Sequence, residues 1–423
     1  MNRTTRVHGG DSTAPTHAPI PSTNSVTLSW LIIGGGIHGV HLATRLIGEA
    51  GVPVECVRIL DPGERLLVRW RACTTVTGMK HLRSPSVHHL GVETSSLSRF
   101  SGQRRNRKPG LFAYPYDRPA LALFDAHCDR LIADHALDSI HVRGRAIECR
   151  FDSDTVVTKT STGQTLRAKK VVLALGATDQ LEWPSWARID DPRVAHIFDA
   201  GFAYPSVPTD KPIAVVGGGI SAAQVALRLH ADGHKVHLVS RHELREHQFD
   251  SAPGWQGPKF MARFNRETSV KQRRQLIATA RNKGSLPPDV RATLRREIKA
   301  GNIVWHNAEV NALDVDDRKL TLSISGNEQL NVDRILLATG FTSQRPGGAM
   351  LDAFIQSESL PCAPCGYPIV DTALRWHPNV YVTGPLAELE LGPVARNIAG
   401  ARRAGDRLVA SLRDQVVHDE HHG

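Results

Sequence analysis

The stretch WLIIGGGIHGVHLATRL, residues 30 to 46, joins a short apolar run, three consecutive glycines and an apolar pattern of helical period. This order predicts a β-strand, a tight turn and an α-helix. In such a turn the first glycine permits the bend, the second lets the backbone approach a pyrophosphate, and the third lets helix and strand pack closely. These positions are Gly34, Gly36 and Gly39. Because free N–H groups and the helix dipole favour negative charge here, the stretch predicts a dinucleotide cradle.

A second stretch, IAVVGGGISAAQVALRL at residues 213 to 229, repeats this pattern. Its corresponding small residues are Gly217, Gly219, Ser221 and Ala222. One such motif is a weak signal. Two copies, each after an apolar run and before a helical pattern, are much stronger, because chance would have to supply the context twice. The sequence therefore predicts an α/β fold with two Rossmann-like dinucleotide-binding halves.

The strand after each cradle predicts which dinucleotide binds. Asp61 lies at the tip of VECVRILD, where a carboxylate accepts hydrogen bonds from an adenosine ribose and repels a 2′-phosphate. At the second tip, Ser240 and Arg241 place a hydroxyl beside a guanidinium, which suits a 2′-phosphate. We therefore expect FAD in the first cradle and NADPH in the second. A surface arginine that merely follows a strand is the alternative for Arg241.

Each half then closes with an apolar strand that ends in small residues. VVLALGA contains Gly176, and RILLATGF contains Thr339 and Gly340. Small residues here would let the backbone turn against the dinucleotide without side-chain clash. A third strand, NVYVTG, ends at Gly384. We expect all four residues to lie at the cofactors, and ordinary strand-end residues are the alternative.

This layout resembles flavoproteins with two dinucleotide-binding domains, and within them the class B flavin monooxygenases of the N-hydroxylating kind, which oxidise ornithine or lysine side chains. The family pattern Asp-x3-(Leu/Phe)-Ala-Thr-Gly-Tyr-x4-(His/Pro) is similar to DRILLATGFTSQRP at 333–346, with Phe341 for tyrosine. The pattern Gly-x-Gly-x-Ser-Ala-Ala-Glu is similar to the stretch from Gly217 to Gln224, where glutamine replaces glutamate. The first cradle matches generically.

The resemblance implies an FAD domain at 26–207 and 341–423 with an inserted NADPH domain at 208–340. It implies a monooxygenase that uses NADPH and molecular oxygen to hydroxylate an amine nitrogen of an amino acid or related small molecule through a C4a-hydroperoxyflavin. It also implies a C-terminal helix whose N-terminus points toward the flavin. The sequence places the start of that helix at Pro393, with Gly392 as the residue that approaches the cofactor.

The family segment that lines flavin and substrate resembles TTVTGMKHLRSP at 74–85, where His81 replaces an acid. Lys80 could hold a substrate carboxylate as a point charge, and an ordinary solvent-facing lysine is the alternative. His81 or His196 could touch the nicotinamide or the flavin, and a structural histidine is the alternative for each.

Cys362 and Cys365 form a C-x-x-C pair, the dithiol of thioredoxin-like redox chemistry. The pair predicts an alternative function, an NADPH-dependent flavin disulfide reductase or other pyridine-nucleotide oxidoreductase. Its place in a proline-bounded loop beyond the second cradle favours an incidental or structural pair. Six cysteines in 423 residues imply no disulfide framework and indicate a reducing compartment, so we expect a cytoplasmic protein.

The net charge of +10 gathers between Lys259 and Lys299, where twelve Lys and Arg residues accompany three acidic ones. The segment has helical patterning with a break at 284–288, and no aromatic residue after Phe264 is interleaved with the charges. This pattern argues against nucleic acid. A solvated helix face and attraction of a phosphate-bearing cofactor are the two interpretations. A flavin-loaded redox sensor that binds a partner through this segment is a third, non-enzymatic hypothesis.

The remaining stretches predict few special features. No apolar run approaches the ~18 to 20 residues of a membrane helix, so we expect no membrane span. Residues 1–25 are rich in Ser, Thr, Pro and Gly, which predicts a disordered tail. The three histidines of VVHDEHHG lack nearby residues that would complete a ligand set, so we expect no metal.

Overall fold

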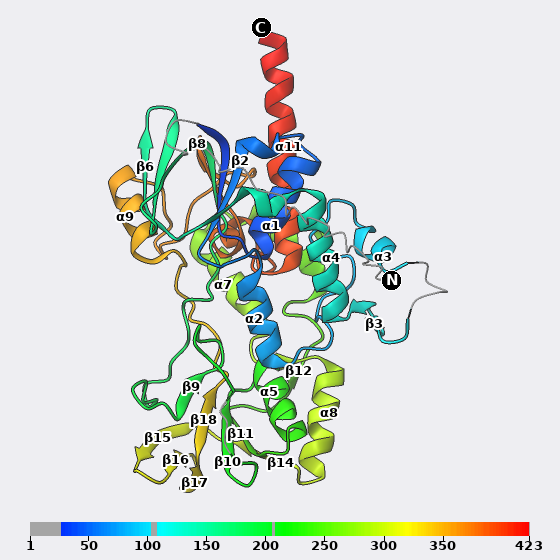
Figure 1. Ribbon diagram of the computed structural model, residues 1–423, viewed down its shortest axis with the longest axis vertical. Coiled ribbons are helices and arrows are strands. Elements are labelled where there is room, and N and C mark those ends of the chain that lie inside the picture. The colour runs from blue at the N-terminus through cyan, green and yellow to red at the C-terminus, as the bar shows by residue number, and fades with distance from the viewer. Residues whose placement is uncertain (1–26, 103–107, 205–207, 423) are drawn as a thin grey trace, which may run out of the picture.

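The computed structural model describes residues 27–102, 108–204 and 208–422, with side chains described as far as residue 413. The expected disordered tail therefore lies outside the described residues. Figure 1 shows two α/β halves, each built on its own sheet, one above the other along the long axis. This arrangement confirms the predicted fold class. In the described part of the chain, no helix is both long and apolar enough to cross a bilayer.

The upper half contains an eight-stranded sheet around the first predicted strand and helix, β1 (Leu28–Ile33) and α1 (Ile37–Gly48). β1 pairs in parallel with strands on both sides, and its side chains are buried on both faces, as a central parallel strand requires. The strand order is β19-β20-β8-β1-β2-β5, with β7 pairing β8 and β6 pairing β7. The other strands are β2 (Val57–Asp61), β5 (His141–Arg143), β6 (Ala146–Asp152), β7 (Thr155–Thr160), β8 (Thr165–Leu173), β19 (Arg375–His377) and β20 (Val380–Val382).

Helices cover this sheet, and the last of them corrects a prediction. Helix α11 runs from Ile398 to His422 and packs along α1, so it begins after the expected start at Pro393. Gly392 has a φ of +76°, and the amides of Ala395 and Asn397 donate to nearby carbonyls in turns, so the chain bends before the helix starts. The other helices and short strands are α2 (Val68–Thr77), α3 (Ser96–Phe100), β3 (Phe112–Ala113), β4 (Arg118–Pro119), α4 (Leu121–Asp134), α9 (Gly348–Glu358) and α10 (Glu388–Leu391).

The lower half contains a parallel five-stranded sheet in the order β14-β11-β10-β18-β9. The second predicted strand and helix form as β10 (Pro212–Val216) and α5 (Ile220–Ala231). β9 precedes residue 207, yet it pairs with β18, so the chain enters the second sheet earlier than the expected domain boundary. The remaining elements are β9 (Val194–His196), β11 (Lys235–Ser240), β12 (Arg245–Glu246), β13 (Ser285–Leu286), α8 (Pro288–Lys299), β14 (Ile303–Asn307), β15 (Val310–Val315), β16 (Leu320–Ile324), β17 (Glu328–Val332) and β18 (Arg334–Leu337).

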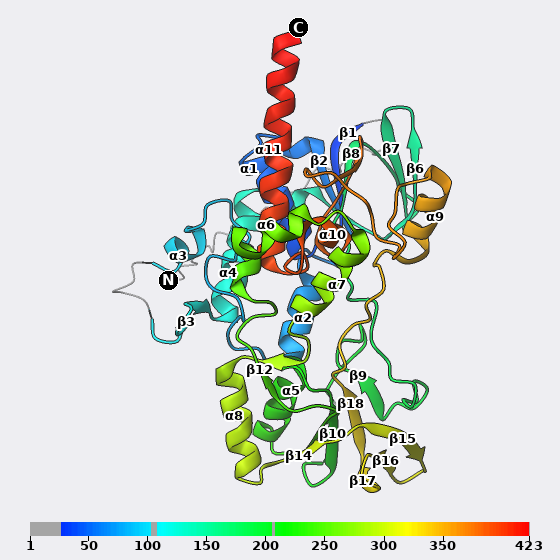
Figure 2. The ribbon, with the colours of Figure 1, turned by 180° about the vertical axis from the view of Figure 1, so that it is seen from behind.

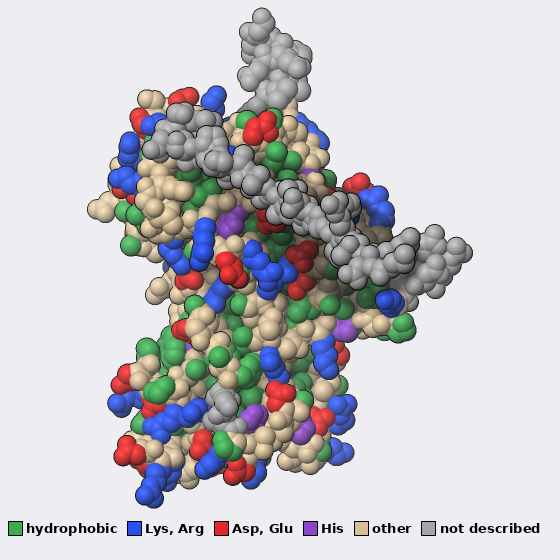
Figure 3. Space-filling model, in the orientation of Figure 1, with side chains coloured by type: hydrophobic (Ala, Val, Ile, Leu, Met, Phe, Trp, Pro, Cys, Tyr) green, Lys and Arg blue, Asp and Glu red, His purple; other side chains and the backbone are tan. Residues whose placement is uncertain are grey.

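Two helices of the basic segment leave the lower half and pack on the upper one. In Figure 2, α6 (Pro258–Arg266) and α7 (Val270–Ala280) lie beside α10 and α11. Phe264 of α6 is fully buried in one apolar cluster with Leu389 of α10. The basic segment is therefore more than a solvated face. Figure 3 shows the face opposite to α6, where basic and acidic side chains are intermixed.

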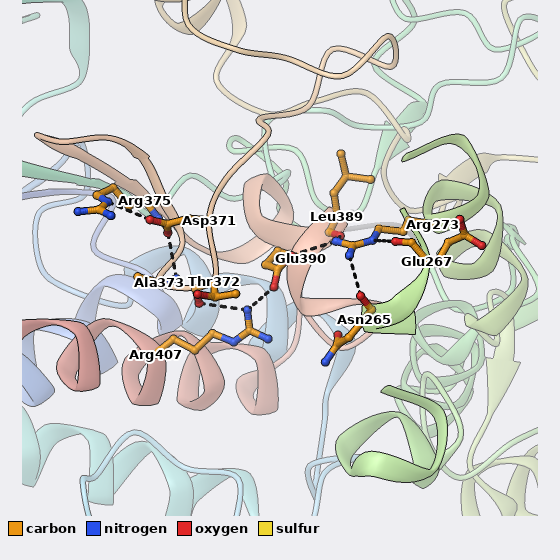
Figure 4. A network of polar contacts seen from close by, with 10 residues as sticks. All are labelled: Asn265, Glu267, Arg273, Asp371, Thr372, Ala373, Arg375, Leu389, Glu390 and Arg407. Atoms are coloured by element: carbon orange, nitrogen blue, oxygen red, sulfur yellow. Dashed lines mark hydrogen bonds and ion pairs between the residues drawn. The ribbon is translucent and has the colours of Figure 1, made fainter. Parts of the chain in front are cut away.

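Figure 4 shows how the charges of α7 are used at this contact. Arg273 donates to the carboxylate of Glu390 at 3.0 Å and to the carbonyl oxygens of Asn265 and Glu267. Arg407 of α11 donates to the other oxygen of Glu390 at 2.7 Å. One acid on α10 thus joins two arginines from helices that are far apart in the sequence.

Candidate functional site

The first cradle joins β1 to α1, and its glycines have different tasks. A Cβ on Gly34 would lie 2.4 Å from the carbonyl oxygen of Ala174, and one on Gly39 would lie 1.8 Å from that of Gly34. These positions admit no side chain, because strand, turn and helix already touch there. A Cβ on Gly36 would meet nothing within 4 Å. The space at the helix N-terminus is therefore open, as a pyrophosphate would require.

Asp61 lies where the sequence places it, at the end of β2 beside this cradle. Its carboxylate accepts hydrogen bonds from the amides of Gly35 at 2.7 Å and Gly63 at 2.8 Å. The side chain therefore fixes the cradle and its own turn. A carboxylate has about four acceptor positions, so it can also accept from a ribose hydroxyl.

The second cradle repeats the geometry of the first. A Cβ on Gly217 would lie 2.5 Å from the carbonyl oxygen of Ala338, just as a Cβ on Gly34 would clash with the carbonyl oxygen of Ala174. Ala222 is buried at the third position and packs under the turn. The small-residue ends of the closing strands are thus explained, because each strand presents its backbone to the first glycine of a cradle. Ser221 lies in the first turn of α5.

The residues that follow each closing strand lie in the segments that connect the two halves. The hydroxyl of Thr339 donates to the carbonyl of Glu182, and the amide of Glu182 donates to the carbonyl of Gly340 at 3.0 Å. Gly340 has a φ of +87°, which favours glycine. A Cβ on Gly176 would meet only the Thr178 hydroxyl, at 4.0 Å. Cofactor contacts by Gly176, Thr339 and Gly340 stay predictions.

The tip of β11 differs from its prediction. Ser240 is only 2% exposed, its hydroxyl donates to the carbonyl of His242 at 3.0 Å, and it accepts from the indole of Trp305 at 2.9 Å. Its hydroxyl thus makes two hydrogen bonds within the protein, and a phosphate contact by Ser240 stays a prediction. Arg241 is exposed beside it and stays a candidate. The ring of His242, which the sequence prediction left out, lies against Gly218 of the cradle.

Two glycines near the C-terminus have different surroundings. Gly384 has a φ of +64° and lies against the ring of His38, in the first turn of α1, whose Nδ1 is 2.9 Å from the hydroxyl of Thr383. Burial lowers the pKa of His38 to about 4. A Cβ on Gly392 would lie 3.2 Å from the sulfur of Met261. Met261 thus lies close to Gly392, and a cofactor contact by Gly392 stays a prediction.

The expected catalytic residues do not form one cluster. Lys80 is exposed, and its carbonyl accepts from the amide of Leu121 beside α4. The Nε2 of His81 lies 2.9 Å from the carbonyl of Gly110. Both residues belong to the upper half.

His196, by contrast, ends β9 at the edge of the lower sheet. It is 0% exposed, and burial lowers its pKa to about 4. Its Nδ1 accepts from the amide of Phe198 at 3.2 Å. This setting favours a structural histidine.

A small polar cavity lies where three distant segments meet. Arg83, from the upper half, donates to Asp250 at 2.6 Å, to the hydroxyl of Ser285 at 2.8 Å and to two backbone carbonyls of the lower half. The Nε2 of His88 lies 2.9 Å from the side-chain oxygen of Gln256, and burial lowers the pKa of His88. The lining residues are Arg83, Ser84, His88, Phe249, Asp250, Ser251, Gln256, Asn397 and Ala399. The cavity therefore reaches the start of α11.

Beside this cavity, Glu388 is 1% exposed and accepts hydrogen bonds from Arg274 and, at 2.7 and 3.1 Å, from Arg396. Burial alone would raise the pKa of Glu388, but the hydrogen bonds and charges of Arg396 and Arg274 hold it below its ordinary value. Arg274 also lies over the ring of Tyr367, 3.9 Å from its centroid. Glu388 on α10 thus links Arg274 of α7 to Arg396, which lies just before α11.

We expect Glu388→Gln to destabilise the protein by about 3–5 kcal/mol, because it leaves two arginines without their buried counter-charge. Urea unfolding measures the change in free energy. The control is Glu148→Gln, whose carboxylate pairs with Lys159 while both side chains are about half exposed, and which should cost less than about 1 kcal/mol. Equal effects of the two variants would contradict the interpretation.

Cys362 and Cys365 are free thiols. Cys362 is half-buried, and Cys365 is exposed. Arg274 donates to the sulfur of Cys365 at 3.6 Å. Burial raises the pKa of Cys362, which disfavours the thiolate that redox chemistry needs. In the described ranges, no three His, Cys, Asp or Glu side chains gather into a metal-binding group.

The family described as pyridine nucleotide-disulphide oxidoreductase matches residues 28–252, just over half of the chain and including both cradles. No curated protein sequence matches the chain.

Among solved structures, the fold is similar to that of FAD-bound DfoA, the desferrioxamine-pathway cadaverine monooxygenase of Erwinia amylovora (14% identity, 92% of this chain and 95% of that one, TM-score 0.71). It is similar to the ornithine N-hydroxylase KtzI of Kutzneria sp. 744 (16% identity, 92% and 100%, TM-score 0.69). It is also similar to the bacillithiol disulfide reductase of Bacillus cereus (18% identity, 92% and 100%, TM-score 0.59). At these identities the similarity concerns the fold.

Proposed function

Because this chain belongs to the pyridine nucleotide-disulphide oxidoreductase family, we propose that it is an FAD- and NADPH-dependent monooxygenase that hydroxylates an amine nitrogen of a small molecule. The observation that carries the proposal is the repeated cradle, in which the elbow of 333–346 packs on Gly217. The fold similarity to a cadaverine monooxygenase and an ornithine N-hydroxylase supports the choice of reaction.

The two cradles supply the cofactor sites. Gly34, Gly36 and Asp61 would hold FAD, and Gly217 and Gly219 would hold NADPH, because each half has a glycine turn at a helix N-terminus, where a pyrophosphate can bind. When bound, the flavin and nicotinamide supply the electrons that activate oxygen. The protein's part is to bind and orient both groups and to exclude water between the halves. As part of the same proposal, the cofactor domains are 26–207 with 341–423 for FAD and 208–340 for NADPH, except that β9 (Val194–His196) joins the sheet of the NADPH domain.

We place the proposed substrate site next to the cavity beside α11, whose own free space of about 20 Å³ has room for roughly one water molecule. An amine must lose its proton before its nitrogen can attack, so a free carboxylate nearby would oppose the reaction. Arg83 already neutralises Asp250, which lines the cavity. His88 adds no negative charge that would hold the amine in its protonated form, and burial lowers the pKa of its imidazole.

Oxygen transfer tests the proposal. The FAD-loaded protein is given NADPH and ¹⁸O₂ with each of a set of primary amines, while NADPH loss and hydrogen peroxide are followed together. We expect at least one amine to accelerate NADPH oxidation and to carry one ¹⁸O atom in the product. Stoichiometric peroxide with every amine, and no labelled product, would contradict monooxygenation.

The disulfide-reductase alternative rests on the exposed thiol of Cys365 and its contact with Arg274. The variants Cys362→Ser and Cys365→Ser separate the two functions. We expect both to keep full amine-dependent turnover, since Cys362 has a raised pKa and the proposed reaction uses neither thiol. Reduction of a disulfide substrate by NADPH that both variants lose would support the alternative instead.

A further inference from the structure

A second cavity lies at the edge of the five-stranded sheet in the lower half. Its lining residues come from β9, from β18 and from the segments on either side of β9, and its free space is about 210 Å³. An apolar cavity of about 150 Å³ can hold one benzene ring. The cavity therefore has room for a ring of that size together with a small polar group.

This cavity lies toward the end of the sheet opposite to the second cradle. Arg334, one of its lining residues, begins β18 and pairs with Ile213 near the start of β10. The cradle follows Val216, at the other end of β10. Because a dinucleotide binds at the carboxyl ends of such parallel strands, the cavity is separate from the proposed NADPH site.

The floor of the cavity is apolar because of the register between its two strands. Leu336 of β18 pairs with Ala195 of β9, and both side chains belong to the same apolar cluster on one face of the sheet. On this face α5 and α8 pack on β10, β11 and β14, whereas the loop that contains Phe202 lies beside β9 and β18. The small side chain of Ala195 thus leaves space between the sheet and this loop.

An aromatic ring forms one wall of this space. Phe202 packs against the same apolar cluster, and its ring meets that of Tyr204 edge-on, with 5.3 Å between the centroids. The hydroxyl of Tyr204 donates to the carbonyl of Val76, and the guanidinium of Arg228 lies 4.2 Å from the centroid of the Tyr204 ring. These contacts fix Tyr204, which in turn holds the ring of Phe202 in place.

The two arginines that line the cavity differ in how far their donors are used. Arg193 donates to both carboxylate oxygens of Asp191, at 3.0 and 2.8 Å, and to a backbone carbonyl at 2.8 Å. Within the described ranges, Arg334 donates only to the carbonyl of its neighbour Asp333, at 3.0 Å. The carboxylate of Asp333 lies 3.7 Å from the amine of Lys211. Arg334 therefore keeps donors and a positive charge for a ligand.

We propose that this cavity binds a small monocarboxylate with a flat apolar body. The carboxylate accepts hydrogen bonds from the guanidinium of Arg334, a pairing that the planar geometry of both groups favours. The apolar body lies over Ala195 and against the ring of Phe202. A single charge suits the site, because Arg193 already has its counter-charge in Asp191. The site goes beyond the proposed function, since it is separate from both cradles and from the cavity beside α11.

Fluorine NMR with the full-length protein tests the site, with 4-fluorobenzoate as the probe. We expect a dissociation constant of about 1 mM or lower. The amide 4-fluorobenzamide has the same shape without the charge and should bind at least about tenfold more weakly, since it cannot form the charge-assisted hydrogen bonds. Saturating NADP⁺ should not displace the probe. Absence of binding, equal affinity for acid and amide, or displacement by NADP⁺ would each overturn the proposal.

Two variants locate the bound probe in this cavity. Arg334→Gln should weaken 4-fluorobenzoate at least about tenfold and leave the amide nearly unchanged. Its matched control is Arg295→Gln, which removes an exposed charge from α8 in the same half and should bind like the unaltered protein. Ala195→Leu fills the floor and should weaken acid and amide together. Circular dichroism shows whether each variant is folded. Unchanged binding of the acid by Arg334→Gln, or by folded Ala195→Leu, would overturn the assignment.

Discussion

Acidification from pH 8 is expected to unfold the protein before pH 4 is reached, because several histidines are buried without charge. His89, His127 and His196 are at most 2% exposed, and burial lowers the pKa of each to about 4 from 6.5. In the unfolded chain these histidines bind a proton at about pH 6.5, whereas in the folded protein they stay unprotonated down to about pH 4. Stability that is fully present above pH 6.5 is therefore lost progressively as the pH falls.

The expected loss is large compared with ordinary protein stability. At pH 5, a histidine with these two pKa values destabilises the folded state by about 2 kcal/mol, and three such groups by about 6 kcal/mol. A typical domain is stable by only about 5–15 kcal/mol. The rings of His89 and His127 lie 5.2 Å apart, so protonation of one opposes protonation of the other in the folded state. We expect the midpoint of acid unfolding between pH 4 and pH 6.

Thermal melting followed by circular dichroism from pH 8 to pH 4 measures this effect. His127→Gln removes one buried titrating group and can keep a hydrogen bond to the hydroxyl of Ser96, which lies 2.8 Å from the ring in the unaltered protein. Its melting temperature should fall less steeply between pH 6.5 and pH 5. His247→Gln changes an exposed histidine and should follow the unaltered curve. A melting temperature that stays constant from pH 8 to pH 5 would contradict the buried neutral state.

The sequence predicts the two cradles well because their physics is local. A strand, a glycine turn and a helix are set by neighbouring residues, and β1 with α1 and β10 with α5 form where the patterns place them. The elbow at 333–346 is also interpretable, because its small residues repeat in both halves. The start of α11 was wrong by five residues, since the positive φ of Gly392 and the following turns separate Pro393 from the helix.

Features that depend on distant segments could not be predicted in this way. The cavity needs Arg83, Asp250 and Asn397 to meet, and no local pattern links them. The burial of Ser240 depends on Trp305, which arrives 65 residues later. The ring of His242 likewise meets Gly284 only because the fold brings a later segment beside the strand tip. The pairing of Arg273 and Arg274 with acids on α10 likewise could not be predicted from the basic segment alone.

The colour of the purified protein is expected to depend on one glycine of the first cradle and not on its counterpart in the second. Gly36→Val should fold, because a Cβ there meets nothing within 4 Å and the backbone φ of −80° suits any residue. Its side chain would fill the space in which the flavin pyrophosphate must lie. The helix N-terminus would then lose contact with the phosphates, so we expect FAD binding to weaken by a hundredfold or more, equivalent to about 3 kcal/mol.

Two further variants distinguish loss of cofactor from loss of fold. Gly219→Ala places a methyl group in the second cradle, 3.5 Å from Gly284, and should leave a yellow protein with weakened NADP⁺ binding. Gly34→Ala combines a φ of +117° with a contact of 2.4 Å to Ala174, so it should lower the stability of the protein whether or not FAD is bound. The ratio of absorbance at 450 nm to that at 280 nm gives flavin content, and urea unfolding gives stability. A fully yellow Gly36→Val would mean that the first cradle does not hold the flavin phosphates, because no pyrophosphate could share that space with a valine side chain.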